Sequence, residues 1–308
     1  MRKISLIVLN WNGWEDTFSC LNSIVKAEIS SFTMEIILID NASNNLPLTR
    51  ISRYKKLAQN NGVNLIFIQN SVNYGFAEGN NIGIKKALVN NADYIMLLNN
   101  DVIIDKFLLK NLFIAAEKEK SSSIIAPKIY FAKGFEYHKK RYQENDLGRV
   151  IWYAGGIIDW KNIYCFHRGV DEVDGGQYEK SEATDFASGC CMFIPRRIVE
   201  KIGFFDRRYF LYFEDVDYCL CAKQRGFKIL YAAQAVLWHK NAQSSGNVGS
   251  SLQEYYQTRN RLLFGFKYGK LRVKAALLKE TAGFLGKSKV KRKAIFDFFS
   301  GNFGEVKT

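Results

Sequence analysis

Residues 35–43 read EIILIDNAS, an apolar run that ends in turn-forming residues. Such runs are typical of strands buried on both faces of a parallel sheet. The pattern recurs through the first half of the chain and alternates with helical patterns. This indicates an α/β fold with a central, mostly parallel sheet flanked by helices. Expected strands are 4–9, 35–39, 64–68, 94–98 and 123–129, and expected helices are 15–26, 48–60, 77–90 and 106–119.

Polar residues directly follow three of these strands. They are Asn10, Asp40 and the run Asn99 to Asp101. Ligands of open α/β sheets bind beyond the carboxyl ends of the strands, so we expect these side chains to converge on one cleft. Asn and Asp are also common turn residues, which gives each of them a purely structural explanation as well.

The segment 131–182 interrupts the alternating pattern with basic residues, paired glycines and aromatics, and we expect an insertion or a flap over the cleft. A second apolar core should follow, with a strand at 186–194, a helix at 214–225 and helices from Ser251 onward. We divide the chain into a main domain, 1–250, with halves 1–130 and 131–250, and a basic helical extension, 251–308.

Residues 207–221, RRYFLYFEDVDYCLC, place Glu214, Asp215 and Asp217 among large apolar side chains at an expected helix start. A carboxylate in a partly desolvated pocket wall needs a partner or a chemical task. Acidic residues in a first helical turn also stabilise the helix dipole. Either interpretation, a catalyst or a helix cap, fits this segment taken alone.

The composition is that of an ordinary globular protein, with 308 residues, 47% of them apolar and 24% charged. The six cysteines lack zinc-ribbon or redox spacing, so we expect free thiols in a reducing cytoplasm. The apolar run before Asn10 is too short for a signal peptide, and no stretch approaches the ~20 apolar residues of a membrane span.

The formal charge of +14 is concentrated near the C-terminus, where residues 256–293 contain twelve Lys or Arg and a single acid, Glu280. Apolar and basic residues alternate there as in a helix on an anionic membrane surface. A solvated helix packed on the body is the alternative. Charge concentrated in a tail argues against a nucleic-acid-binding groove.

Nine motifs together resemble those of family 2 glycosyltransferases, most of all the non-processive, rhamnosyltransferase-like branch. The resemblance implies the GT-A fold, with a nucleotide-sugar-binding first half and an acceptor and catalytic second half. The motifs are SLIVLNWNG (5–13), ILIDNAS (37–43), NYGFAEGNN (73–81), YIMLLNNDV (94–102), AGGIID (154–159), HRGVDEVDGGQYE (167–179), SGCCMFIPRR (188–197), FEDVD (213–217) and VLWHK (236–240).

The resemblance implies a role for individual residues of the expected cleft. Asp215 matches the general base of the acidic motif. Asp40, with Asn10 beside it, should contact the nucleotide. Gly75 and Gly79 permit close approach of the backbone to a ligand before a helix N-terminus, which favours phosphate.

The segment Asn99–Asn100–Asp101 resembles the DxD motif that binds a divalent cation, with Asn99 in place of the first acid. Asn99 still offers a neutral oxygen to Mg²⁺ or Mn²⁺, so we expect metal binding, though weaker. His239 resembles a downstream histidine that some family members offer to the metal, and an imidazole ligand favours Mn²⁺. A packed, hydrogen-bonded histidine is the alternative.

The acceptor and the flap should involve Trp152, Asp185, Glu214 and Asp217. A single base fits a one-step displacement that inverts the anomeric centre. By resemblance we expect a dTDP-rhamnose donor, a lipid-linked or oligosaccharide acceptor, and action at the inner face of the membrane. A homodimer is possible. The processive QxxRW motif is missing, because Gln257-Thr-Arg-Asn lacks the tryptophan. A sugar-phosphate nucleotidyltransferase and a basic nucleic-acid-binding or membrane-binding module are the alternatives.

Overall fold

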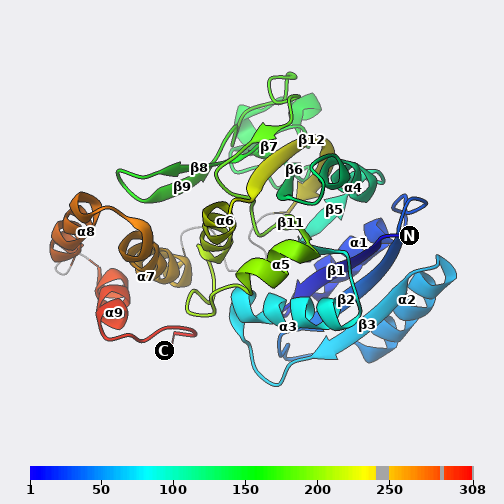
Figure 1. Ribbon diagram of the computed structural model, residues 1–308, viewed down its shortest axis with the longest axis horizontal. Coiled ribbons are helices and arrows are strands. Elements are labelled where there is room, and N and C mark those ends of the chain that lie inside the picture. Colours follow the sequence, from blue (N-terminus) through cyan, green and yellow to red (C-terminus); the bar gives the residue numbers. More distant parts are fainter. Residues whose placement is uncertain (241–249, 285–287, 307–308) are drawn as a thin grey trace.

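The structure is a computed structural model that describes residues 1–240, 250–284 and 288–306. Its centre is a ten-stranded sheet with the order β10-β12-β6-β11-β4-β1-β2-β3, to which β5 adds beside β12 and β7 beside β6 (Figure 1). The strands are β1 (Lys3–Asn10), β2 (Thr33–Asp40), β3 (Asn64–Gln69), β4 (Tyr94–Asn99), β5 (Val102–Ile104), β6 (Ser123–Phe131), β7 (Ile151–Tyr153), β10 (Glu182–Ala183), β11 (Cys191–Pro195) and β12 (Lys228–His239).

Four parallel strands, β3, β2, β1 and β4, form one half of the sheet, as the apolar runs predict. Their register pairs Asn10 with Asp40 and Leu9 with Asn99, so the polar strand ends lie at one edge. β11 then enters antiparallel between β4 and β6. It begins only at Cys191, so the expectation of a strand from residue 186 was wrong; residues before Cys191 form a turn that lines a cavity.

Helices lie where the sequence predicts them: α1 (Trp14–Ile24), α2 (Leu48–Asn60), α3 (Gly75–Val89), α4 (Leu108–Lys118) and α6 (Glu214–Gln224). A further helix, α5 (Arg196–Ile202), was not predicted. α3 packs closely on β1 and β2. A Cβ atom on Gly83 would lie 2.6 Å from Ile7 Cγ2 and 2.8 Å from Ile39 Cδ1, so only glycine fits this crossing. Gly79 faces Leu9 in the same way.

The predicted C-terminal helices are α7 (Ser251–Tyr268), α8 (Leu271–Phe284) and α9 (Lys289–Phe299), which lie together at one end of the molecule (Figure 1). Side chains of Ser250 and Ser288 cap α7 and α9 by accepting from the N–H groups of Gln253 and Lys291. A single apolar cluster runs from Ile4 in β1 to Ile295 in α9. Among the described residues, none of the helices is long and apolar enough to span a membrane.

The 131–182 segment is built onto the sheet through β7 and β10 and carries a hairpin, β8 (Gly156–Asp159) and β9 (Tyr164–His167). A buried ion pair anchors it: Lys128 Nζ of β6 lies 2.9 Å from Asp174 Oδ2. The hairpin projects toward α7 and α8 (Figure 1).

The close crossing of α3 over the sheet leads to the first prediction. Gly83→Ala should lower the free energy of unfolding by about 1–3 kcal/mol, because its methyl group would overlap Ile7. Gly283→Ala is the matched control. Nothing lies within 4 Å of a Cβ there, so alanine should raise stability by about 0.5–1 kcal/mol. Denaturant unfolding of both variants measures the effect, and a Gly83→Ala protein as stable as the parent would refute this packing.

Candidate active site

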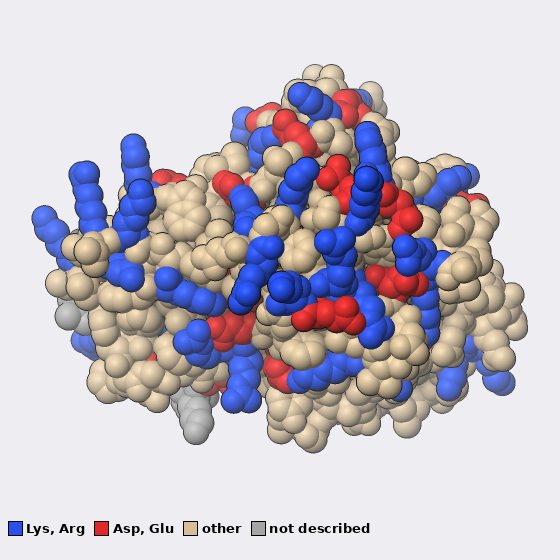
Figure 2. All heavy atoms as spheres, viewed as in Figure 1, with Lys and Arg blue, Asp and Glu red and all other residues tan. Residues whose placement is uncertain are grey.

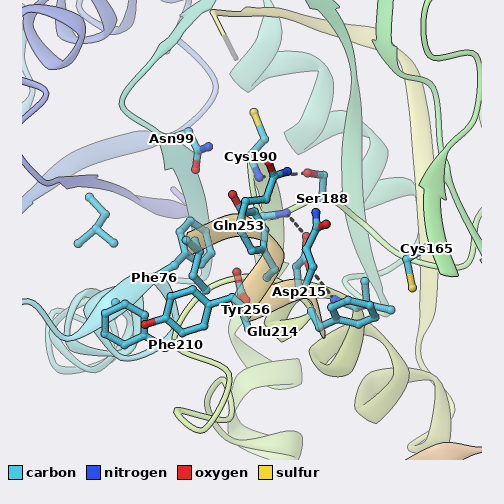
Figure 3. Close-up of a pocket in the computed structure, with 18 of the residues that line it drawn as sticks. Phe76, Asn99, Cys165, Ser188, Cys190, Phe210, Glu214, Asp215, Gln253 and Tyr256 are labelled. Atoms are coloured by element: carbon cyan, nitrogen blue, oxygen red, sulfur yellow. Dashed lines mark hydrogen bonds between the residues drawn. The ribbon is translucent and has the colours of Figure 1, made fainter. Parts of the chain in front are cut away.

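A cavity of about 630 Å³ opens at the carboxyl ends of the strands. Figure 3 shows Asn99, Ser188, Glu214 and Asp215 on its wall. The wall combines the ends of β4 and β12, the start of α6 and part of α7. Its chemically relevant side chains are Asn41, Asn99, Asp101, Trp152, Phe166, Ser188, Glu214, Asp215, His239 and Tyr256.

Asp101 and His239 are brought together by strand pairing, because Val102 of β5 lies opposite His239 of β12. The His239 Nε2 atom is 3.1 Å from Asp101 Oδ1, and both residues are buried. The imidazole packs edge-on against Trp152, with 4.6 Å between ring centroids. The predicted pair therefore exists, although 138 residues separate its members.

Asp101 and His239 could supply two of the ligands of a divalent cation, but not a complete ligand set. A carboxylate and an imidazole are suitable ligands, and the Nδ1 atom of His239 is buried without a hydrogen-bond partner. Within residues 1–240, 250–284 and 288–306, however, no group of three or more His, Cys, Asp or Glu side chains could hold a metal ion. A bound cation would therefore depend on oxygens of the ligand and of water for most of its coordination.

Asp215 faces the cavity from the first turn of α6. Its Oδ2 atom accepts from Gly189 N at 2.8 Å, and its Oδ1 atom accepts from Val216 N at 2.8 Å. Burial raises the pKa of the Asp215 carboxyl, and these backbone N–H groups oppose the shift by stabilising its ionised form. The carboxylate is thus both held in place and accessible to a ligand in the cavity.

Glu214 also lines the cavity but is in a different state. Only 4% of the residue is exposed, and its Oε2 atom has no hydrogen-bond partner. Burial and then the charge of Asp215 raise the pKa of the Glu214 carboxyl well above its ordinary value. This environment favours the protonated form of Glu214 beside an ionised Asp215.

Asp217 and Asp185, expected near the acceptor, do not lie on the cavity wall. Asp217 is buried and lies 2.8 Å from Lys267 Nζ of α7, and it also accepts from the Tyr209 hydroxyl. Asp185 binds Lys223 Nζ at 3.1 Å and the backbone N–H of Ile158. Asp185 thus holds the β8–β9 hairpin of the 131–182 segment, and Asp217 holds α7. A contact of either residue with the acceptor remains a prediction.

Asn10 and Asp40 do not line the cavity either. Asp40 is fully buried, and its carboxylate accepts from Asn10 Nδ2 at 2.8 Å and from the hydroxyl and backbone N–H of Ser43. Asn10 Oδ1 in turn accepts from Thr17 Oγ1 and Asn100 Nδ2. Asn10 therefore lies beside Asp40, as expected. Their direct contact with the nucleotide remains a prediction.

Asn41, which the sequence analysis missed, reaches the cavity in place of Asp40. Its amide accepts from the N–H of Tyr74 and donates to the carbonyl of Gly75, so it fixes the turn that begins α3. Gly79 packs on Leu9 and does not line the cavity, and its approach to a ligand remains a prediction. The signal for Asn41 was its place directly after the strand end in the DNAS segment.

The start of α3 is closed by the chain itself. Gly75 lines the cavity with φ +73°, and a Cβ there would lie 2.6 Å from the Phe210 ring. The N–H groups of Phe76 and Ala77 donate to the Phe210 carbonyl at 2.6 and 3.3 Å. Two N–H groups of this helix N-terminus therefore already have a partner within the chain. Phosphate binding near Gly75 remains a prediction.

The loop 209–213 that precedes Asp215 has a strained backbone. Phe210, Tyr212 and Phe213 all have positive φ, between 62° and 72°. The Asn260 side chain of α7 donates to three carbonyls of this loop, those of Tyr209 (2.8 Å), Leu211 (2.7 Å) and Tyr212 (2.9 Å).

Arg259, the neighbour of Asn260, strengthens the same contact. It is fully buried, donates to the carbonyls of Arg208 and Tyr209 at 3.0 Å each, and its guanidinium lies over the Tyr256 ring. The sequence analysis treated these two residues only as an incomplete QxxRW motif. We call Arg259 and Asn260 the α7 clamp.

The fold and the cavity define a glycosyltransferase with the GT-A fold. The model for "Glycosyltransferase like family 2" matches residues 2–265, and the chain belongs to that family. This assignment decides against the nucleotidyltransferase and nucleic-acid-binding alternatives.

Curated relatives include two glycan-building enzymes. The chain is 24% identical over 261 residues to the low-salt glycan biosynthesis hexosyltransferase Agl10 of Haloferax volcanii, covering 84% of this chain and 74% of the relative. It is 24% identical over 225 residues to the N-acetylglucosaminyl-diphospho-decaprenol L-rhamnosyltransferase of Mycobacterium tuberculosis, covering 69% and 68%.

Solved structures confirm the fold. The crystal structure of GalNAc-T7 with UDP, GalNAc and Mn²⁺ superimposes with a TM-score of 0.61 at 18% identity, over 97% of this chain but only 58% of that one. The mannosyltransferase PcManGT from Pyrobaculum calidifontis, in complex with GDP-Man and Mn²⁺, gives 0.58 at 11% identity over 98% and 80%.

The α7 clamp leads to the second prediction. Asn260→Ala should lower the free energy of unfolding by about 1–3 kcal/mol, because three loop carbonyls lose their donor. Thr258→Ala on the same helix is the control, since its hydroxyl donates only to the Glu254 carbonyl of its own helix. Urea unfolding compares the two variants. Equal stability of Asn260→Ala and Thr258→Ala would show that the hydrogen bonds of Asn260 do not stabilise the fold.

Proposed function

We propose that this enzyme transfers one sugar from a nucleotide-diphosphate donor to an acceptor hydroxyl in a single displacement that inverts the anomeric centre. The observation that carries the proposal is that Asp215 shares one cavity with Asp101 and His239. A base for the acceptor and a site for the leaving diphosphate are then within one enclosure. Burial favours the protonated form of Glu214, and a protonated carboxyl can neither attack the sugar nor take up the acceptor proton. Asp215 is therefore the general base in this proposal.

Asp101 and His239 would hold a divalent cation, Mn²⁺ or Mg²⁺, with Asn99 beside them. A cation held there would supply counter-charge for the leaving diphosphate. The structures of GalNAc-T7 and PcManGT, which were solved with a nucleotide and Mn²⁺, support this assignment by their similar fold. An imidazole ligand favours Mn²⁺ over Mg²⁺.

The acceptor is proposed to be lipid-linked or an oligosaccharide, and the donor dTDP-rhamnose. The name of the Mycobacterium tuberculosis relative, an N-acetylglucosaminyl-diphospho-decaprenol L-rhamnosyltransferase, supports the rhamnosyl group and the lipid-linked acceptor. Aromatic side chains on the cavity wall, Trp152, Tyr137 and Phe166, offer faces on which sugar rings stack. We place the reaction at the inner face of the cytoplasmic membrane, as one step of cell-surface glycan synthesis, with no processive extension.

The base assignment gives the third prediction. Asp215→Asn should lower kcat by ~10²-fold to 10⁴-fold while donor affinity changes little, because an amide cannot take the acceptor proton. The measurement is release of nucleoside diphosphate over a panel of donors, together with donor binding. Asp105→Asn, outside the cavity, is the control. A variant at Asp215 that transfers as fast as the parent would refute the assignment.

The cation site gives the fourth prediction. Chelation by EDTA should abolish transfer, and Mn²⁺ should restore it better than Mg²⁺. Asp101→Ala and His239→Ala should each need more Mn²⁺ for half-maximal activity, since each removes one ligand of a site that has few. His138→Ala, at an exposed histidine, should behave as the parent. Full activity in EDTA, or unchanged Mn²⁺ dependence in both site variants, would contradict the proposal.

A further inference from the structure

Helix α8 carries an apolar stripe on its solvent side. Leu271 and Leu278 are 84% and 46% exposed, and Ala275 and Ala282 are exposed as well. At 3.6 residues per turn these four positions fall within a stripe about 60° wide. Leu277 and Thr281, roughly 90–130° around the helix from the centre of the stripe, are buried against the protein. The stripe is therefore additional to the face with which α8 packs.

Basic residues flank this stripe on both sides. Arg272 and Lys279 lie along one edge, and Lys274 lies along the other. Figure 2 shows Lys and Arg side chains projecting over the α8 end of the molecule. The acid of α8, Glu280, is neutralised by Arg261, whose Nη2 atom lies 2.8 Å away. The exposed side of α8 is thus apolar in the centre and cationic at its margins.

The β8–β9 hairpin extends this surface toward the cavity. Arg261 of α7 donates to the Asn162 carbonyl at the hairpin tip and to Glu280 of α8, so it joins both elements. Near the tip the aromatic residues Trp160, Tyr164 and Phe166 are 41%, 52% and 47% exposed. Phe166 also lines the cavity, so the exposed aromatic surface reaches the site itself.

We propose that the solvent side of α8 and the tip of the β8–β9 hairpin form a docking face for an anionic lipid bilayer. In that orientation the apolar stripe enters the boundary between headgroups and acyl chains, and the flanking cations contact lipid phosphates. The aromatic residues of the hairpin lie at headgroup level, where amphipathic rings are favoured. Delivery of a lipid-linked acceptor along Phe166 rests on the proposed function, whereas the docking itself does not.

Charge decides between this partner and a second copy of the chain. A two-fold symmetric dimer through α8 would set Arg272, Lys274 and Lys279 against the same residues of the other copy, in a chain of net charge +14. Like charges facing each other oppose association. Anionic headgroups neutralise the same residues.

The fifth prediction is tested by flotation of the full-length protein with vesicles of phosphatidylcholine alone or with phosphatidylglycerol added. Binding is expected only with the anionic vesicles. The double variant Arg272→Gln and Lys279→Gln should bind them roughly 25-fold more weakly, since each basic residue near anionic lipid contributes ~1 kcal/mol. Leu271→Asn with Leu278→Asn should also weaken binding, because it removes the apolar stripe.

The control double variant is Lys55→Gln with Lys56→Gln, which removes the same charge from exposed positions on α2. It should bind as the parent does. Equal loss in the α2 and α8 variants, or equal binding to neutral vesicles, would overturn the docking face. So would α8 variants that turn a dimer into a monomer and leave vesicle binding unchanged. The assay uses no sugar donor, so its outcome is independent of the proposed reaction.

Discussion

The hydrogen bonds from the Asn260 side chain to the carbonyls of loop 209–213 are the constraint on which the site depends. Three residues of that loop have positive φ, which costs about 1–3 kcal/mol each for non-glycine residues. The loop holds the start of α3 through the Phe210 carbonyl, and it leads directly into Glu214 and Asp215. Donors on α7 therefore offset part of the backbone strain in the loop that leads to Glu214 and Asp215.

Because of these hydrogen bonds, the C-terminal helices are part of the candidate site and not a separate extension. Leu252 and Tyr256 of α7, and Val306 beyond α9, lie on the cavity wall, and Lys267 pairs with Asp217 of α6. The division at residue 250 remains a prediction, but the apolar core and the cavity both cross it. The same helices that position the active site thus carry the basic surface on their outer side.

The sequence predicted the strands, the helices and the family motifs well, because buried parallel strands are long apolar runs and their ends carry turn residues. The sequence could not predict which of two neighbouring side chains points into the cavity. Asp40 is the last residue of β2 and points into the protein, whereas Asn41, the first residue after the strand, lines the cavity. The sequence gives no signal for the hydrogen bonds of Asn260, because their acceptors are backbone carbonyls, which every residue has.

The order of the strands has a consequence for synthesis on the ribosome. Strands β1 to β4 pair with one another, and all four have been synthesised by Asn99. The hydrogen-bond partner of Asp101, His239, and that of the loop 209–213, Asn260, are synthesised much later. Chains emerge with the N-terminus first, so the parallel half of the sheet is available long before its partners. Until Cys191–Pro195 is made, β4 exposes an unpaired edge that invites aggregation. The edge of β4 is thus covered only once Cys191–Pro195 has been made, and the contacts of the candidate site with His239 and Asn260 form later still.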